Sequence, residues 1–157
     1  MDGLSDIREM AGGDIDDVSR LVGKCIEVCS RDVYNDDERR YWVSLYSGEN
    51  FMKYTEGWKF FVLSLEGRVV GCAGLNRDEV KGMFVDPKFQ GKKLGKKLLD
   101  FLENCARESG VFKLVLDSSL NGVGFYRRNG YVFVEDRVYE TGLQGGCIRV
   151  VRMSKVL

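Results

Sequence analysis

A turn rich in glycine and lysine is the part of this sequence whose residue types best suit the binding of an anion. It follows Asp86-Pro87 and contains Gly91 and Gly95. Proline ends the strand before it, because proline fixes φ and adds no donor to a sheet. Apolar residues then recur at helical spacing, at Leu94, Leu98, Phe101, Leu102 and Cys105. A helix start leaves backbone N–H groups unpaired at the positive end of the helix dipole, so the sequence predicts a phosphate-binding turn.

Composition limits the other chemistry that the chain can perform. The 157 residues include no histidine, so metal sites and Ser-His or Cys-His catalysis lose their usual ligand or base. The five cysteines form no C-x-x-C pair, and their odd number argues against a disulfide framework. Lys plus Arg number 24, as do Asp plus Glu, so no net charge attracts nucleic acid or a membrane. We expect a cytoplasmic protein that binds no metal, no nucleic acid and no membrane.

The turn lies within an alternating order of strands and helices. Apolar patterns predict strands at residues 7–10, 59–65, 68–75, 79–85, 112–117, 131–134 and 147–153. They predict helices at about residues 15–29, 36–46, 94–109 and 122–128. Between the second and third strands, Glu66-Gly67 is a hairpin signal. The order indicates a mixed α/β layer, which we interpret as a single domain over residues 1–157.

Two segments, in this order, resemble the signatures of the GNAT superfamily of N-acetyltransferases. The turn is similar to V-x-P-x-[FY]-[QR]-G-x-G-[LI]-G-x-x-L-[LM], with matches at Val85, Pro87, Phe89, Gln90, Gly91, Leu94, Gly95, Leu98 and Leu99. Residues 122–131 are similar to the later segment A-x-x-[FL]-Y-x-x-x-G-[FY]. The order of elements is similar too. The resemblance implies a GNAT-like fold, with a central twisted, mostly antiparallel sheet, a splayed parallel strand pair and helices on both faces.

The resemblance also implies a binding site for acetyl-CoA as co-substrate. In the family, main-chain groups of the strand before the turn hold pantetheine, which corresponds here to Met83, Phe84 and Val85. The turn amides hold the pyrophosphate, which corresponds to Gln90, Gly91, Lys92, Lys93, Leu94, Gly95 and Lys96. The side chains of Lys92, Lys96 and Lys97 either attract phosphates or form a solvated helix face.

Lys93 departs from the family pattern, which usually has glycine at this position. Either the φ angle of Lys93 is negative in this chain, or the turn is slightly strained. In both cases we expect the side chain to point outward and the amide to remain available to a ligand.

Two residues are candidates for proton transfer. Tyr126 matches the family tyrosine that often donates a proton to the departing CoA thiolate, and its reference pKa of about 10 lies near the thiol's value of roughly 8.5. Its alternative role is an aromatic side chain packed on the sheet. Glu79, at the start of the strand before the turn, is either a general base or an exposed strand end, and Asp117 is a second choice.

The resemblance therefore implies transfer of an acetyl group from acetyl-CoA to a primary amine by direct attack. The acceptor is a small-molecule or peptide amine, and one or two aromatic residues of the segment 34–58 are expected to line its pocket, with the others in the core. An alternative is a non-catalytic acyl-CoA-binding or interaction domain on the same fold. The last strands and an exposed sheet edge are suited to a homodimer.

Overall fold

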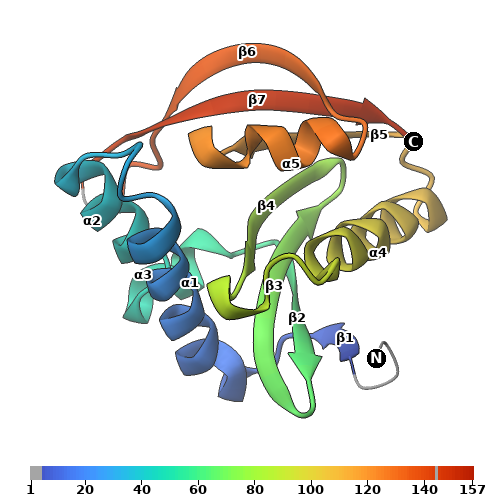
Figure 1. The fold of residues 1–157 in the computed structure, drawn as a ribbon, viewed down its shortest axis with the longest axis horizontal. Coiled ribbons are helices and arrows are strands. Elements are labelled where there is room, and N and C mark those ends of the chain that lie inside the picture. The colour runs from blue at the N-terminus through green and yellow to red at the C-terminus, as the bar shows by residue number, and fades with distance from the viewer. Residues whose placement is uncertain (1–4, 144) are drawn as a thin grey trace.

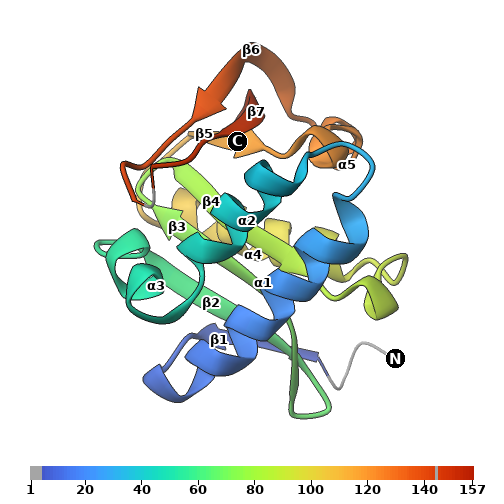
Figure 2. The same ribbon diagram turned by 90° about the vertical axis from the view of Figure 1, so that its left-hand side faces the viewer.

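The computed structural model describes residues 5–143 and 145–157, which form a sheet covered by helices (Figures 1 and 2). The strands are β1 (Ser5–Glu9), β2 (Lys59–Leu65), β3 (Arg68–Asn76), β4 (Glu79–Val85), β5 (Lys113–Ser118), β6 (Val132–Tyr139) and β7 (Ile148–Val156). They form one seven-stranded sheet in the order β1-β2-β3-β4-β5-β7-β6. Only β4 and β5 pair in parallel among these neighbours of the described chain. The predicted mixed, mostly antiparallel sheet is confirmed.

Helices cover both faces of the sheet, as expected. They are α1 (Ile15–Cys29), α2 (Asp36–Leu45), α3 (Gly48–Tyr54), α4 (Leu94–Glu108) and α5 (Val123–Arg128), with short 3-10 turns at Gly12–Asp14, Pro87–Phe89 and Leu120–Gly122. In Figure 2, α1 and α2 lie in front of the sheet and α4 lies behind it. In the described part of the chain, no helix has the length and apolar character that crossing a membrane requires.

Alternation along the strands builds a core on each face. On β2, Phe60 and Val62 pack with α1, α2 and α3, whereas Phe61 packs with α4. Successive side chains of a strand point to opposite faces, so one apolar strand supplies both cores. The strand β6 is longer than predicted and is exposed on both faces for most of its length. The sequence predicts that this strand ends at Val134, because the alternation of apolar and polar residues that marks a half-buried strand is missing beyond it.

The parallel pair opens soon after it forms. β4 and β5 pair only at Glu79 with Val115 and at Val80 with Leu116. Beyond these positions, β4 continues to pair with β3, and β5 continues to pair with β7. In Figure 1, β4 runs steeply across the direction of β7. The edge of β4 that faces β5 therefore has no strand partner beyond Val80 among the described residues.

A bulge in β4 follows the last paired position. Lys81 pairs with Gly74 of β3, and Phe84 pairs with Cys72, so β4 has one more residue than β3 between these pairs. An extra residue of this kind bends a strand and redirects its backbone groups. The bulge therefore lies at the point where the strand must turn away from β5.

Gly82 makes this bulge sterically feasible. Its φ is +64°, in the left-handed region, where a side chain is unfavourable. A Cβ atom at Gly82 would lie 2.9 Å from the Phe60 ring and 2.9 Å from the Tyr46 hydroxyl. Two independent constraints thus require glycine at this position.

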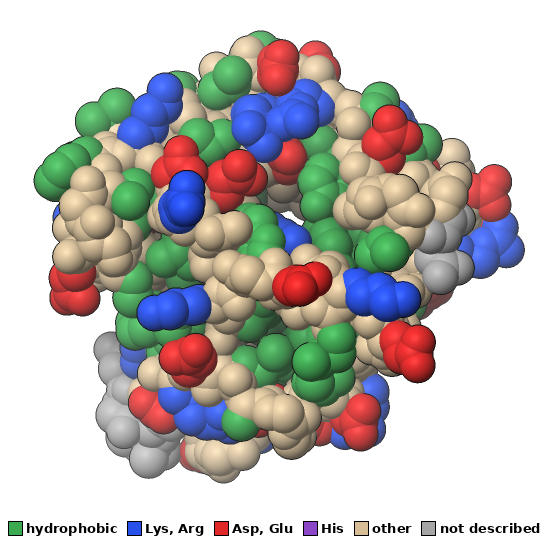
Figure 3. All heavy atoms as spheres, turned by 180° about the vertical axis from the view of Figure 1, so that it is seen from behind, with side chains coloured by type: hydrophobic (Ala, Val, Ile, Leu, Met, Phe, Trp, Pro, Cys, Tyr) green, Lys and Arg blue, Asp and Glu red, His purple; other side chains and the backbone are tan. Residues whose placement is uncertain are grey.

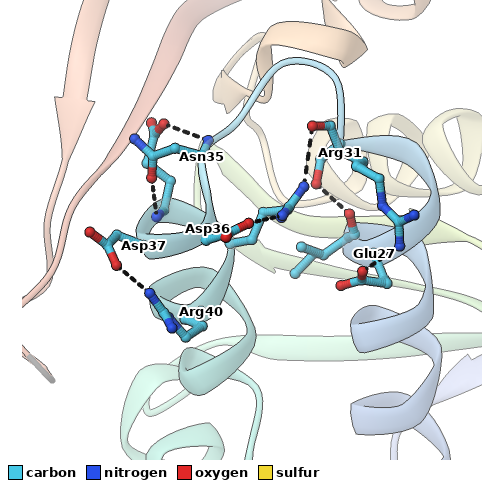
Figure 4. A network of polar contacts seen from close by, with 10 residues as sticks. Glu27, Arg31, Asn35, Asp36, Asp37 and Arg40 are labelled. Atoms are coloured by element: carbon cyan, nitrogen blue, oxygen red, sulfur yellow. Dashed lines mark hydrogen bonds and ion pairs between the residues drawn. The ribbon is translucent and has the colours of Figure 1, made fainter.

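Polar contacts fix the start of α2 (Figure 4). Asn35 Oδ1 accepts a hydrogen bond from the Glu38 amide at 2.8 Å, and Glu38 Oε1 accepts one from the Asn35 amide at 3.2 Å. Asp37 pairs with Arg40 on the exposed side of the helix. Glu38 also bonds to Arg149 on β7 at 2.8 Å, and this hydrogen bond lowers the pKa of Glu38 to about 2. The helix is thereby held against the end of the sheet.

The substitution Gly82→Ala tests the bulge. We expect it to lower the free energy of unfolding by about 2–4 kcal/mol, because it adds left-handed strain to a steric clash. Gly12→Ala is the matched control, since no atom lies within 4 Å of a Cβ there and φ is not positive. Urea denaturation measures both variants. Equal unfolding midpoints for the two variants would contradict the role given to Gly82.

Candidate active site

One cavity of about 810 Å³ lies between the diverging strands. It is lined by most of the predicted site residues, namely Glu79, Met83, Phe84, Val85, Gln90, Gly91, Lys93, Leu94, Gly95, Lys96 and Tyr126. Lys92 lies outside the lining; its side chain is exposed, with Nζ 5.4 Å from the centroid of the Phe89 ring. The fold therefore brings the glycine- and lysine-rich turn, β4 and Tyr126 to a single space.

The turn is anchored to the end of β4. The buried Asp86 carboxylate accepts a hydrogen bond from the Lys88 amide at 2.9 Å and pairs with Lys24 on α1 at 3.0 Å. Burial raises the pKa of Asp86, but the Lys88 amide and the Lys24 ammonium outweigh burial and hold the pKa below its usual value. Gln90 Nε2 donates to the Val85 carbonyl at 3.1 Å. These contacts fix where α4 begins.

The first amides of α4 form a row of free donors. The bond from the Lys97 amide to the Lys93 carbonyl, at 3.0 Å, opens the helix. Within the residues that the structure describes, the backbone amides of Gly91–Lys96 have no hydrogen-bond acceptor, and no side chain caps the helix. Gly91 adopts a φ of +80°. Unpaired amides at a helix start, beside a cavity, fit the oxygens of a pyrophosphate.

The sequence leaves two conformations open for Lys93, and the structure has the strained one. Its φ is +62° and its ψ is 15°, in the left-handed region. The side chain is exposed, as expected. A residue with a Cβ is disfavoured there by about 1 kcal/mol relative to glycine.

Gly95 positions the second predicted segment. A Cβ on Gly95 would lie 3.3 Å from the Phe125 ring, so its absence lets α5 approach α4. The next residue, Tyr126, packs its ring against Phe125 and Tyr131, with centroids at 5.2 and 5.7 Å. The Tyr126 hydroxyl forms no hydrogen bond with the described residues and is open to the cavity, and partial burial of the side chain raises the pKa of this phenol above its usual value. Tyr126 therefore stays protonated beside the cavity.

The two candidate carboxylates differ in their pairing. Asp117 binds Arg152 through two hydrogen bonds, at 3.0 and 3.1 Å, and lies 3.6 Å from Arg137. Glu79 is exposed, and the Arg152 guanidinium lies 4.0 Å from it. Both carboxylates line the cavity. Glu79 is therefore the less tightly paired of the two carboxylates. Among the described residues, no cluster of Asp, Glu or Cys side chains is arranged to hold a metal ion.

Aromatic residues form the end of the cavity away from the turn. Trp42, Tyr46, Tyr54, Trp58 and Tyr139 line it. Four of them come from the segment 34–58: Trp42 and Tyr46 lie on α2 and just after it, and Tyr54 and Trp58 lie at the end of α3 and in the loop that follows. The Tyr139 hydroxyl donates to the Tyr54 hydroxyl at 3.1 Å, which joins β6 to α3.

Figure 3 shows basic and acidic side chains interspersed over the back of the molecule, with a narrow opening between them.

Lys81 is a cavity residue that sequence reasoning missed. Its Nζ donates to the Tyr54 carbonyl at 2.6 Å and lies 3.7 Å and 4.1 Å from the ring centroids of Tyr54 and Trp58. Burial lowers the pKa of Lys81 to about 8, while the nearby charge of Glu79 opposes this shift. The spacing from Glu79 predicts that both side chains share one face of β4. The aromatic partners come from a distant part of the sequence, so the pattern gave no further signal.

The pair of substitutions Lys93→Gly and Lys92→Gly tests the strain in the turn. Lys93→Gly should raise the free energy of unfolding by about 0.5–1 kcal/mol, because glycine relieves the left-handed strain. Lys92 does not have a positive φ, so Lys92→Gly should lower stability slightly through the added freedom of the unfolded chain. Urea denaturation compares them. A loss of stability in Lys93→Gly would show that the turn is not strained.

Comparisons with known proteins agree with this geometry. Residues 30–157 match the family model described as the acetyltransferase (GNAT) domain. A protein named IAA acetyltransferase from Azospirillum brasilense is 34% identical over 82 residues, which cover 46% of this chain and 54% of the relative. A glucosamine 6-phosphate N-acetyltransferase from Trypanosoma brucei brucei is 32% identical over 84 residues, which cover 46% and 57%. The chain thus spans about half the length of these relatives.

Solved structures share the fold over almost the whole chain. A GCN5-related N-acetyltransferase from Rhodopseudomonas palustris superposes with a TM-score of 0.89 at 24% identity, covering 99% of this chain and 97% of that protein. The PaiA N-acetyltransferase from Thermoplasma acidophilum, solved in complex with coenzyme A, has a TM-score of 0.74 at 20% identity, with coverage of 98% and 99%. These structures confirm the GNAT-like fold. Together with the family match over residues 30–157, they show that the chain belongs to the GNAT family of acetyltransferases.

Proposed function

We propose that this chain transfers the acetyl group of acetyl-CoA to a primary amine by direct attack. The observation that carries the proposal is the cavity between β4 and β5, which joins a row of free amides to Tyr126 and to an aromatic pocket. A donor with a polyanionic end and a reactive end fits such a space, and the aromatic pocket is left for the acceptor. The names of the relatives, which specify small-molecule acetylation, support a small acceptor.

The donor would lie along β4. The amides of Gly91–Lys96 would bind its pyrophosphate, and the exposed Lys96 side chain, which is paired with Asp100 at 2.7 Å, would add positive charge nearby. Pantetheine contains amide groups, and the edge of β4 beyond Val80 offers main-chain partners at Met83, Phe84 and Val85. Backbone groups perform this binding, so the side chains of these residues remain free to fill the core.

Direct attack requires two proton transfers. The amine must lose a proton before its lone pair attacks the thioester carbonyl, and Glu79, directly or through water, is placed to accept that proton. The C–N bond forms and the C–S bond breaks, which leaves a thiolate. Tyr126 donates its phenolic proton to the thiolate sulfur, and solvent reprotonates the phenolate.

We also propose that the chain forms a homodimer through β6. This strand is one of the two edges of the sheet, and its apolar side chains are exposed at Val132, Phe133, Val134 and Val138. An apolar edge strand can pair with a second copy. Light scattering should give the mass of a dimer for the wild type and of a monomer for Phe133→Lys. A monomeric wild type would contradict the proposal.

Tyr126→Phe tests the proposed general acid. Turnover, measured as amine-dependent CoA release, should fall by about 100-fold or more, with little change in acetyl-CoA affinity, because the ring remains and only the proton donor is lost. Tyr41→Phe is the matched control. That tyrosine bonds to Thr141 outside the cavity lining, so its loss should reduce stability and leave turnover intact.

Two outcomes would contradict different parts of the proposal. Unchanged turnover in Tyr126→Phe would remove the acid role of Tyr126 and leave transfer itself in place. Acetyl-CoA binding without CoA release, for every amine supplied to the wild type, would favour a non-catalytic acyl-CoA-binding domain.

A further inference from the structure

We propose that Lys81 binds an anionic group of the acceptor, so that the preferred acceptor is a primary amine that also carries a carboxylate or phosphate. The inference rests on the proposed acetyl transfer and specifies the acceptor class for the same cavity. Lys81 lies on β4 and lines the aromatic end of the cavity.

The Lys81 ammonium has donors to spare. An ammonium has three N–H groups, and the structure gives Lys81 one acceptor, the Tyr54 carbonyl at 2.6 Å. The rings of Tyr54 and Trp58 cover the ammonium, with centroids at 3.7 and 4.1 Å. Ring faces attract a cation but accept no strong hydrogen bond. Two donors therefore remain for a ligand in the cavity.

Lys81 also has no counter-ion in the part of the chain that the structure describes. No carboxylate of the described residues forms an ion pair with it within 4.0 Å, although Glu79 lies on the same strand. A half-buried cation without a partner is disfavoured by loss of hydration. An anionic group placed beside Lys81 would supply the missing partner, and the low polarity of the aromatic surroundings would strengthen that contact.

The acids nearby do not favour a cationic acceptor. Asp117 is neutralised by Arg152 and Arg137, and Arg152 also lies 4.0 Å from Glu79. Arg137 also lies 3.7 Å from Glu135, so the two arginines pair with three carboxylates, and Lys81 is the basic group of this region that forms no ion pair among the described residues. The aromatic faces of Tyr54 and Trp58 could hold an ammonium ligand, but the Lys81 ammonium already covers them. A polyamine would meet repulsion here rather than a binding site.

The position of Lys81 sets the distance between the two groups of the acceptor. Met83 follows Lys81 by two residues, about 6.5 Å along an extended strand, and the bulge at Gly82 shortens this path. An acceptor whose anion contacts Lys81 would therefore need a short spacer of a few atoms to bring its amine to a thioester held at Met83. Small amino acids and small phosphorylated amines meet this requirement.

Matched pairs of acceptors test the proposal. The pairs, each with the acid first, are β-alanine with β-alaninamide and O-phosphoethanolamine with ethanolamine. Spermidine is added as a polycation. CoA release gives kcat/KM for each acceptor with the wild type, Lys81→Met and Lys53→Met. Lys81→Met keeps the length of the side chain and removes its charge. Lys53→Met removes an exposed charge from α3, the helix that carries Tyr54. Lys81→Gln repeats the test with a polar side chain.

We expect the wild type and Lys53→Met to prefer the acid of at least one pair over its neutral partner by about tenfold or more. Lys81→Met and Lys81→Gln should lose this preference, because kcat/KM should fall much further for the acid than for its neutral partner. The pair that shows the preference identifies carboxylate or phosphate. Three results would overturn the proposal. The first is an equal kcat/KM for the two members of both pairs, and the second is a higher kcat/KM for spermidine. The third is a loss of kcat/KM in Lys81→Met that is equal for the acid and its neutral partner.

A binding measurement separates this inference from the proposed function. Isothermal titration calorimetry of the CoA-loaded protein needs no turnover. The ligands are the acetylated products of the two pairs, namely N-acetyl-β-alanine, N-acetyl-β-alaninamide, N-acetylated O-phosphoethanolamine and N-acetylethanolamine. If either anionic product binds more tightly than its neutral partner, and Lys81→Met loses this difference, the role of Lys81 is supported. This conclusion would hold even if no CoA were released, in which case only the proposed acetyl transfer would fail. Equal binding of acid and neutral product in both pairs, with CoA release intact, would overturn the role of Lys81 and retain acetyl transfer.

Discussion

The divergence of β4 from β5 is the constraint on which the cavity depends. The two strands pair at Glu79 and Val80 and then follow different neighbours, β3 and β7. If the two strands continued to pair in parallel, their backbone hydrogen bonds would close this space. Because it stops, the backbone of β4 is open on one edge, and the start of α4 and the hydroxyl of Tyr126 border the same space. The Gly82 bulge permits the divergence, since no other residue fits its φ and its contacts.

The two faces of the sheet contribute different parts of the site. On one face, α4 supplies free amides, and α5 approaches it closely enough, through Gly95, to place Tyr126. On the other face, α2 and α3 supply aromatic rings, with α2 held to β7 by the pair of Glu38 and Arg149. Under the proposed function, the donor would contact mainly backbone groups and the acceptor mainly side chains. Substitutions of those side chains would then change the preferred acceptor without disturbing donor binding.

The sequence predicted the turn, its helix and the strand before it, but not the surroundings of Lys81 or the extent of β6, for a physical reason. The turn, its helix and the strand before it are contiguous, so their spacing reports their geometry directly. The φ of Lys93 was left open, because a sequence does not show whether a lysine is forced into the left-handed region. Lys81 was missed, because its environment comes from Tyr54 and Trp58, which reach it only through tertiary packing. The extent of β6 was missed because an edge strand exposed on both faces lacks alternation.

A crystal structure of the chain with acetyl-CoA tests the central claim most directly. The account predicts that pyrophosphate oxygens lie within hydrogen-bond distance of the amides of Gly91–Lys96, that pantetheine runs beside Met83–Val85, and that the thioester sulfur faces the Tyr126 hydroxyl. The opening between β4 and β5 would then be filled by the ligand. Acetyl-CoA bound at any other surface, or a complex in which β4 and β5 pair beyond Val80 and exclude it, would contradict the account.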